Sequence, residues 1–313
     1  MRKSVRRLLI TGTAVVGVLA VGLTTTSIAN AVATAQEQDR IVPYGRTVTV
    51  DGREMNVLVA GSGPEDVVLL PGFGTASPVL DFGPLVEDLA ADHRVIVVEP
   101  FGYGLSDGTD RPRTTANIVS EVHTALQQLD VDRYVLMGHS IAGLYAIEYT
   151  HRYREEVTAF VGIDTSVPGQ PNMDTVFPVG LLGAAKDLGL VRLLSGGGGD
   201  DDDRSEEYTA ADREQMRLIS HRTSLEPTYL DEMDRIRTNF AEAADATFPA
   251  DLPLLLFTEA DNLHNPDWLA LHEHQAATVD DGTVAPIDGG HYLHHTHSAE
   301  LAATFRDWRQ RLG

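Results

Sequence analysis

The stretch Tyr134-Val135-Leu136-Met137-Gly138-His139-Ser140-Ile141-Ala142-Gly143 decides the fold of this chain. It begins as an apolar strand, reaches a serine, and continues at once with the apolar spacing of a helix. A serine at such a junction has strained backbone angles and lifts its hydroxyl above the sheet, in the arrangement called a nucleophile elbow. The turn is so sharp that the residues two positions either side must be small, as Gly138 and Ala142 are. We therefore predict that Ser140 is a nucleophile; the alternative is a tight-turn serine in an inactive protein.

A second serine fits the strict pattern Gly-x-Ser-x-Gly better. Ser106 lies in Gly104-Leu105-Ser106-Asp107-Gly108, whereas Ala142 breaks the pattern around Ser140. The residues after Ser106 form the polar stretch Thr109-Asp110-Arg111-Pro112-Arg113, which is typical of turns rather than of a helix. Since the elbow requires the helix, we interpret Ser106 as a loop residue.

Composition limits the kind of protein this is. The chain has 313 residues, of which 42% are hydrophobic, enough for one large core or a core with a subdomain. It has no cysteine, which excludes disulfides, thiolate catalysis and thiolate metal sites. The formal net charge of −22 argues against nucleic acid as a partner and disfavours adsorption to anionic lipid. We interpret this acidity as serving solubility.

The first 35 residues have the layout of an export signal. Four basic residues (Arg2, Lys3, Arg6 and Arg7) precede the apolar run from Leu8 to Leu23. Small-residue cleavage sites follow at Ala29-Asn30-Ala31 or Ala33-Thr34-Ala35. The run is short for a bilayer span, which needs roughly 20 residues, but an uncleaved anchor stays possible. We expect the rest of the chain to be secreted or held at the outer face of the cytoplasmic membrane, with no other membrane contact.

Beyond this leader, strand and helix patterns alternate. Asp51-Gly52 is a hairpin signal between two β-branched segments, and short apolar runs typical of buried parallel strands follow. The expected strands are 47–50, 55–59, 67–70, 95–98, 134–137, 157–163, 252–257 and 283–287. The expected helices are 78–91, 115–129, 141–152, 267–277 and 299–312. This order predicts an α/β fold, with a mostly parallel central sheet and helices on both faces.

The alternation stops between Val167 and Asp251. This segment contains proline-rich turns, two helical stretches at 206–220 and 228–240, and the runs Gly196–Gly199 and Asp200–Asp203. We interpret the two runs as a solvated loop, because the aspartates lack the spacing and closing glutamate of a calcium loop. The chain thus divides into a leader (1–35), a first core part (45–166), a helical cap insertion (167–251) and a second core part (252–313).

A serine hydroxyl needs a base and an acid that orients the base. His291 is the candidate base, because Asp288-Gly289-Gly290 allows a sharp exit from the last expected strand. The acid should follow a preceding parallel strand, and we predict Asp261 for this role. Glu259 and Asp267 are local alternatives, and Asp164, after strand 157–163, is another.

Two backbone N–H groups are candidates for an oxyanion hole. The N–H of Ile141 begins the helix that follows the serine, where free donors and the helix dipole favour negative charge. The second candidate is the N–H of Phe73 in the turn Pro71-Gly72-Phe73-Gly74. A plain glycine turn is the alternative for this second segment.

These motifs together resemble the α/β-hydrolase superfamily in its form with a cap. The resemblance covers roughly residues 45–166 and 252–313, and it rests on the elbow, Pro71–Gly74, the turn Phe101–Asp107 and the terminal Gly-Gly-His. It implies the α/β-hydrolase fold and a triad of Ser140, Asp261 and His291, in the chain order of that fold. It also implies that 167–251 is the cap. Pro71, where many members have histidine, and Ala142 depart from the family pattern.

Two other motifs are weak. Gly102-x-Gly104 lacks the third glycine of a dinucleotide loop, because Asp107 stands there. The histidines 291, 294, 295 and 297 are close enough in sequence to suggest a metal, but a catalytic His291 is a poor ligand. We interpret the others as a solvated or supporting cluster, and expect neither a cofactor nor a metal.

The function expected from these features is that of an exported serine hydrolase acting on a small-molecule acyl substrate, most simply a carboxylic ester. Perhydrolases (haloperoxidases) and carbon–carbon bond hydrolases use the same triad, and a binding protein of this fold is a third class. Apolar cap residues could line an acyl pocket or pack on the core: Phe177, Leu181, Leu182, Leu188, Leu190 and Leu193. Acyl length, alcohol group and oligomeric state are not encoded in these patterns.

Overall fold

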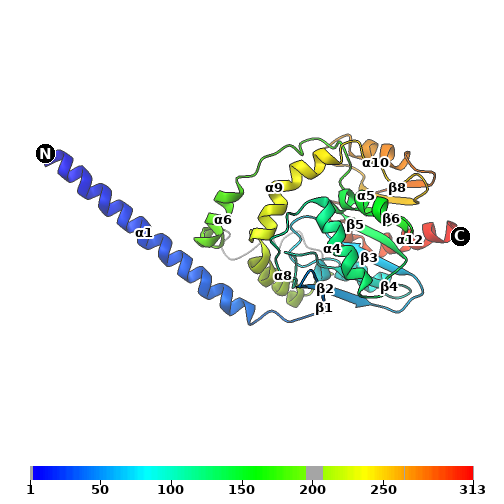
Figure 1. Ribbon diagram of the computed structural model, residues 1–313, viewed down its shortest axis with the longest axis horizontal. Helices are drawn as coiled ribbons and strands as arrows, with labels where there is room; N and C mark the ends of the chain where they lie inside the picture. Colours follow the sequence, from blue (N-terminus) through cyan, green and yellow to red (C-terminus); the bar gives the residue numbers. More distant parts are fainter. Residues whose placement is uncertain (1–2, 195–206, 264, 313) are drawn as a thin grey trace.

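A computed structural model describes residues 3–194, 207–263 and 265–312. Its centre is an eight-stranded sheet with the order β1-β2-β4-β3-β5-β6-β7-β8 (Figure 1). The strands are β1 (Arg46–Val50), β2 (Arg53–Ala60), β3 (Asp66–Leu70), β4 (Arg94–Val98), β5 (Tyr134–His139), β6 (Val157–Ile163), β7 (Leu254–Glu259) and β8 (Gly282–Ile287). Only the pairs of β2 with β1 and β4 are antiparallel among the described strand pairs. The predicted α/β fold with a mostly parallel sheet is confirmed.

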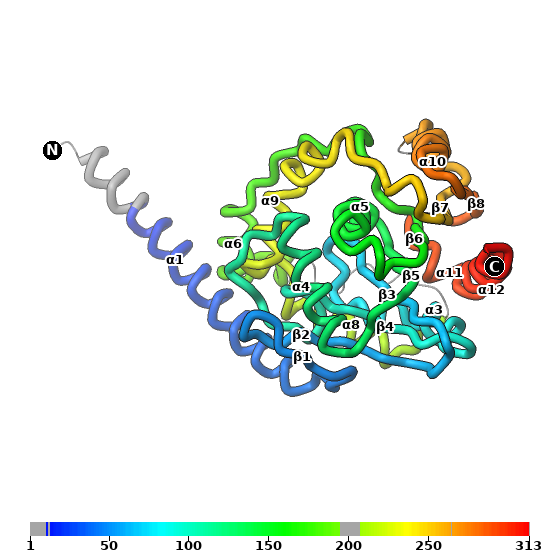
Figure 2. The backbone as a smooth tube through the Cα atoms, turned by 45° about the vertical axis from the view of Figure 1, so that its right-hand side comes forward, coloured from blue at the N-terminus to red at the C-terminus, as the bar shows by residue number. Residues whose placement is uncertain are grey.

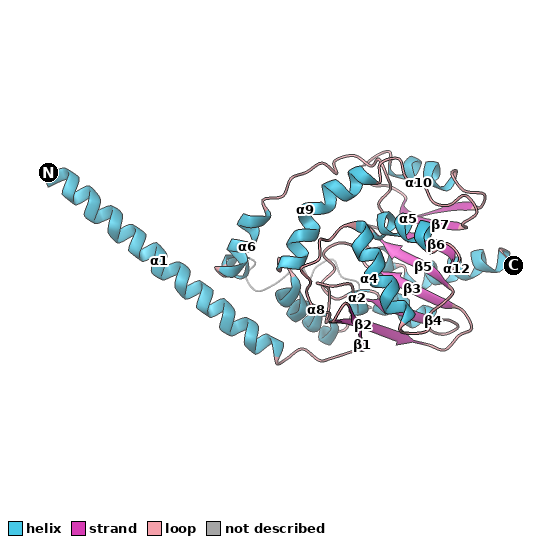
Figure 3. Ribbon diagram, in the orientation of Figure 1, coloured by secondary structure: helices cyan, strands magenta, loops and turns pink. Residues whose placement is uncertain are grey.

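Helices cover both faces of the sheet (Figure 3). On one face lie α4 (Thr115–Gln127), α5 (Ala142–Arg152) and α10 (Trp268–Ala276). On the other lie α2 (Pro78–Asp81), α3 (Gly83–Leu89), α11 (Leu293–Thr296) and α12 (Ser298–Arg311). Strands β3 to β7 are almost fully buried between the two helix layers, which explains their continuous apolar runs.

Between β6 and β7 the chain forms the helices of the expected insertion. These are α6 (Val179–Asp187), α7 (Leu190–Leu194), α8 (Ala210–Thr223) and α9 (Pro227–Glu242). Helix α9 joins this cap to the core through Glu232, whose carboxylate accepts hydrogen bonds from Tyr103 (2.8 Å) and Tyr145 (2.7 Å). The glycine and aspartate runs at 196–203 lie outside the described residues.

The segment predicted to be a leader lies in one long helix, α1 (Lys3–Gln38), which projects from the body in both views (Figures 1 and 2). Its segment Thr13–Gln38 is long and apolar enough to cross a membrane, a property that signal sequences share. Its C-terminal part contacts α7 and α8 of the cap.

Because the parallel strands share one direction, their carboxyl ends meet at one edge of the sheet. The segment after β3 carries Phe73, and the residues directly after β5 and β6 are Ser140 and Asp164. Residues 261 and 291 follow β7 and β8. The topology therefore brings all the candidate residues to this edge, beneath the cap.

Candidate active site

Ser140 has the backbone geometry expected of a nucleophile elbow. Its φ of +54° is in the left-handed region, which side-chain-bearing residues rarely adopt. A Cβ on Gly138 would lie 2.8 Å from the Cβ of Ala142, so small residues are required at both positions. The elbow is fixed to the end of β6 by two backbone bonds, from Ser140 N to Ile163 O (3.3 Å) and from Ser166 N to Ser140 O (2.8 Å).

His291 bridges Ser140 and a carboxylate. Its Nε2 lies 3.1 Å from Ser140 Oγ, and its Nδ1 lies 2.6 Å from Asp164 Oδ2. With Nδ1–H donating to the carboxylate, Nε2 is left as the acceptor for the serine hydroxyl proton. The imidazole is 41% exposed, so its ring edge is accessible from the site.

The carboxylate that pairs with His291 is that of Asp164 and not that of the predicted Asp261. Asp164 turns away directly after β6 with φ +43°, and its side chain is fully buried beneath His291. Asp261 lies two residues beyond the end of β7, where it is exposed. The bonds that fix the elbow to β6 hold the end of that strand beside Ser140. The prediction of Asp261 was therefore wrong, and the alternative Asp164 has the position.

The side chains of the two local alternatives, Glu259 and Asp267, do not pair with His291 in the described hydrogen bonds. Glu259 contributes its backbone N–H, which donates to Asp164 Oδ1 (2.9 Å), and Asp267 is the exposed residue before α10. Trp268 Nε1 also donates to Asp164 Oδ1 (2.6 Å), a contact for which the sequence offered no signal. Burial alone would raise the pKa of the Asp164 carboxyl, but the hydrogen bonds that it accepts outweigh burial and lower the pKa. Asp164 is therefore a carboxylate at neutral pH.

The two predicted oxyanion-hole residues line the same cavity as Ser140 and His291. This cavity has a volume of about 330 Å³, and Phe73 and Ile141 form part of its wall. Gly72 packs directly against the elbow, because a Cβ there would lie 2.8 Å from His139 Nδ1 and 3.0 Å from Ser140 Cβ. A side chain at position 72 would therefore push the Phe73 loop away from the serine.

Cap residues form much of the wall of this cavity, and the sequence patterns identified only some of them. Phe177 lines it as expected, whereas Leu181 and Leu193 are 70% and 63% exposed and point elsewhere. The lining residues not predicted are Ser166, Gln170, Asn172, Met173, Thr175, Ile236, Phe240, Asn262 and Trp268. Aromatic and aliphatic side chains mixed with a few polar groups are typical of sites for small, partly apolar ligands.

Ser106, the serine with the stricter motif, has a structural role. It is buried, its Oγ donates to Glu99 O (2.5 Å), and it accepts from Asn56 N (2.8 Å). Its hydroxyl thus both donates and accepts within the core, and no hydrogen bond described for this structure joins Ser106 to His291.

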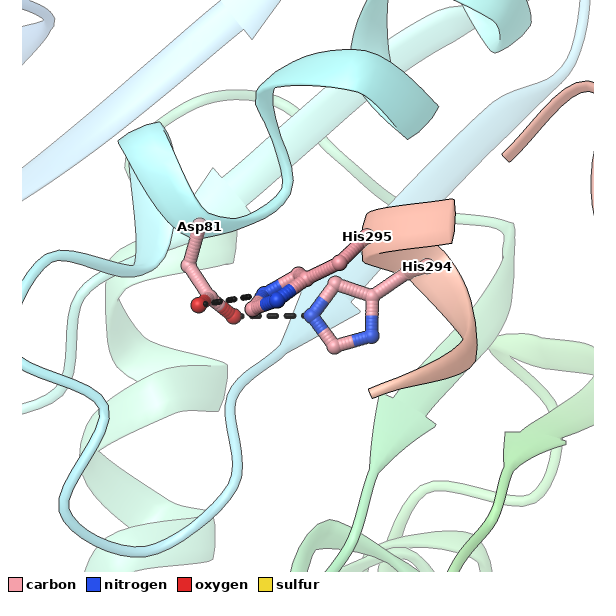
Figure 4. A group of neighbouring side chains, drawn as sticks. All are labelled: Asp81, His294 and His295. Atoms are coloured by element: carbon pink, nitrogen blue, oxygen red, sulfur yellow. Dashed lines mark hydrogen bonds and ion pairs between the residues drawn. The ribbon is translucent and has the colours of Figure 1, made fainter. Parts of the chain in front are cut away.

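A cluster of histidines supports the loop that carries His291. His139 Nε2 donates to the His291 carbonyl (3.0 Å). Asp81 at the end of α2 accepts from His294 and His295 of α11, each at 2.8 Å (Figure 4). Burial raises and the two imidazoles lower the pKa of Asp81, and the net direction is down. The Asp81 carboxylate therefore joins α2, the helix after the Phe73 loop, to α11, the helix after His291.

The same three side chains, Asp81, His294 and His295, could chemically hold a metal ion. Their nearest ligand atoms lie within 4.8 Å of one another, and two histidines with a carboxylate are a common donor set. Both carboxylate oxygens already bond the Nε2 atoms of the two imidazoles, so the atoms that face one another are paired without an ion.

Comparison with known proteins shows the family to which the chain belongs. Residues 67–304 match the model of the alpha/beta hydrolase family. The chain belongs to this family. It is 32% identical over 127 residues to the uncharacterized protein YbdG of Bacillus subtilis, covering 40% of this chain and 39% of YbdG.

Two further likenesses agree with this membership. A 2-hydroxy-6-oxononadienedioate/2-hydroxy-6-oxononatrienedioate hydrolase of Escherichia coli is 31% identical over 107 residues, 32% of this chain and 36% of that protein. The chain thus spans well under half the length of these curated relatives. The crystal structure of Cfl2 from Burkholderia cenocepacia superposes with a TM-score of 0.66 at 21% identity, covering 84% of this chain and 94% of Cfl2. At this identity the likeness concerns the fold alone.

Proposed function

We propose that this α/β hydrolase is an exported serine hydrolase that cleaves a carboxylic ester through an acyl-enzyme. The observation that carries the proposal is the unbroken chain Ser140 Oγ–His291–Asp164, at 3.1 and 2.6 Å, in which Ser140 and His291 line a cavity walled partly by the cap. The left-handed backbone of Ser140 at the end of β5 supports it, because a nucleophile elbow requires this conformation.

In the proposed reaction, Ser140 Oγ attacks the ester carbonyl carbon while His291 Nε2 takes the hydroxyl proton. Asp164 holds the imidazole in the tautomer with Nδ1 protonated and stabilises the imidazolium that forms. The N–H groups of Phe73 and Ile141 stabilise the negative oxygen of the tetrahedral intermediate. The imidazolium returns the proton to the departing alcohol, and water then releases the acid by the same steps.

Export and anchoring are part of the proposal. The basic residues before the apolar run favour retention of that end on the cytoplasmic side, which would leave the hydrolase body outside. The helix α1 also bonds the cap, where Arg192 of α7 pairs with Glu37, and this contact favours retention of α1 as an anchor over its removal.

The test is hydrolysis of a p-nitrophenyl ester series of increasing acyl length by the full chain in detergent. We expect turnover that falls by at least about 10³-fold in Ser140→Ala, because the nucleophile is lost. Ser106→Ala is the matched control and should keep its specific activity while losing some stability. Full activity of Ser140→Ala would contradict the mechanism.

A second candidate is carbon–carbon bond hydrolysis, favoured by the identity with the Escherichia coli hydrolase. Since that match covers about a third of either chain, it ranks second. If the protein cleaves a vinylogous diketone but no ester of the series, carbon–carbon bond hydrolysis would become the first candidate.

A further inference from the structure

The cap presents exposed apolar side chains at one end of the molecule. In α6 and α7, Leu181 is 70% exposed, Leu193 63% and Leu194 86%. Neither helix contains a buried residue. Helix α6 is seated on α9, where Gly183 lies against Leu230, so the exposed side chains belong to a positioned element. Large apolar groups gathered in this way typically mark a surface that contacts another apolar phase.

These helices lie directly against α1. Ser27 Oγ donates to Asp187 O (2.8 Å), and Asn30 Nδ2 to Lys186 O (3.3 Å). Arg192 of α7 bonds Glu37 with two nitrogens, each at 2.8 Å, and Asn30 Oδ1 at 2.9 Å. The cap end is therefore fixed beside residues 27–37 of α1 (Figure 2).

Of the apolar part of α1, the stretch before these contacts carries no charged residue and suits a membrane span, whereas the end of Thr13–Gln38 holds Glu37 and is bonded to the cap. Residues 8–26 would extend about 28 Å at a rise of about 1.5 Å per residue, close to the ~30 Å hydrocarbon core. The three threonines that end this segment return their hydroxyls to α1's own carbonyls, as a bilayer requires. These bonds are Thr24 to Ala20, Thr25 to Val21 and Thr26 to Leu23. The charged pair of Glu37 and Arg192 lies further along α1 than the contacts with α6, on the side away from residues 8–26.

With residues 8–26 in a bilayer, residues 27–30 emerge at its surface and bring the C-terminal end of α6 and the turn before α7 to the same level. In Figure 1, α6 and the loop leading to it reach furthest from the sheet towards the N-terminal part of α1. That loop also carries Thr175 and Phe177, which line the cavity above Ser140. The exposed apolar face and the cavity wall are thus consecutive pieces of one segment.

We propose that α6 and α7 enter the headgroup region of the membrane that holds α1, and that the substrate is an ester-bearing acyl lipid taken from that membrane. The substrate half of this inference rests on the serine hydrolase function proposed above. The acyl chain would pass along the segment 175–181 to Ser140, without crossing water. The net charge of −22 favours a zwitterionic over an anionic lipid surface.

Membrane contact is tested with a fluorescent probe, because the chain has no cysteine of its own. Leu181→Cys is labelled with an environment-sensitive nitrobenzoxadiazole dye, and the full chain is placed in phosphatidylcholine nanodiscs. We expect doxyl-labelled lipid to quench this dye by about half. The matched control is Asp132→Cys, an exposed site before β5 at the opposite end of the sheet, which should remain unquenched. An unquenched dye at 181 would overturn the docking proposal, whether or not the protein is active.

The substrate class is tested with two esters in the same nanodiscs, a diacylglycerol in the bilayer and soluble p-nitrophenyl butyrate. In the double variant Leu181→Glu/Leu194→Glu we expect at least a tenfold loss on the lipid and a change within twofold on the soluble ester. Val42→Glu, an exposed apolar position after α1, should change neither. Wild-type protein that cleaves only the soluble ester, or equal lipid rates in the double variant, would overturn the lipid proposal. Inactivity of the wild type on both, with Ser140 unreactive, would instead refute the hydrolase function.

Discussion

At the scale of residues, the site depends on how Asp164 is held. Four donors converge on its buried carboxylate: His291 Nδ1, Trp268 Nε1, Glu259 N and, at a longer 3.4 Å, Thr258 Oγ1. Sequence reasoning found Ser140 and His291, because their neighbours encode an elbow and a glycine exit. It chose the wrong acid, because every parallel strand ends at the same edge and Asp164 and Asp261 both follow strand ends. The contact of His291 Nδ1 with Asp164 Oδ2, at 2.6 Å, decides between them.

The two carboxylates can be separated by matched substitutions. In Asp164→Asn we expect kcat for a p-nitrophenyl ester to fall about 10³- to 10⁴-fold with KM little changed, because the amide favours the wrong tautomer of His291. Asp261→Asn should stay within about twofold of wild type. Steady-state kinetics on both variants checks this, and a larger loss in Asp261→Asn would contradict the assignment of the acid.

At the scale of elements, strong periodicity predicted most helices and strands within a few residues of their bounds. One helix prediction, on the face covered by α2 and α3, differs from the structure. The single helix predicted for 78–91 is two short ones, which meet at Phe82 before Gly83-Pro84. This break lets α2 end at Asp81, where the carboxylate meets His294 and His295 (Figure 4). No local pattern could have indicated a contact between residues so far apart in the chain.

Asp81→Asn tests this clamp. An amide can accept from only one of the two imidazoles, so a buried donor loses its partner at a cost of about 1–3 kcal/mol in the free energy of unfolding. We also expect a several-fold lower kcat, because α11 directly follows the His291 loop. Urea unfolding and ester turnover measure the two effects, and the exposed Glu87→Gln on α3 is the control. Unchanged stability and turnover in Asp81→Asn would show that the clamp contributes nothing.

At the scale of the whole molecule, buried imidazoles link stability to pH. Burial lowers the pKa of His139 and of His294 below the ordinary value of 6.5. Below pH 6.5 the unfolded chain therefore binds protons at these positions that the folded chain does not bind. Stability contributed by the neutral imidazoles is present above pH 6.5 and is lost as the pH falls.

We expect each of these histidines to lower the free energy of unfolding by about 1 kcal/mol per pH unit below 6.5, down to its own folded pKa. Urea unfolding at pH 7.0, 6.0 and 5.0 measures the slope. His294→Gln should have a shallower slope than wild type, whereas the exposed His274→Gln should keep the wild-type slope. Identical slopes in all three proteins would refute this linkage.

The central claim is that Ser140, activated by His291 and Asp164, is the nucleophile of a serine hydrolase. Its most direct test is labelling of the full chain with a fluorophosphonate, followed by peptide mass spectrometry. We predict one adduct, on the peptide that contains Ser140, absent in Ser140→Ala and formed far more slowly in Asp164→Asn. An adduct on Ser106, or labelling that survives in Ser140→Ala, would contradict the account.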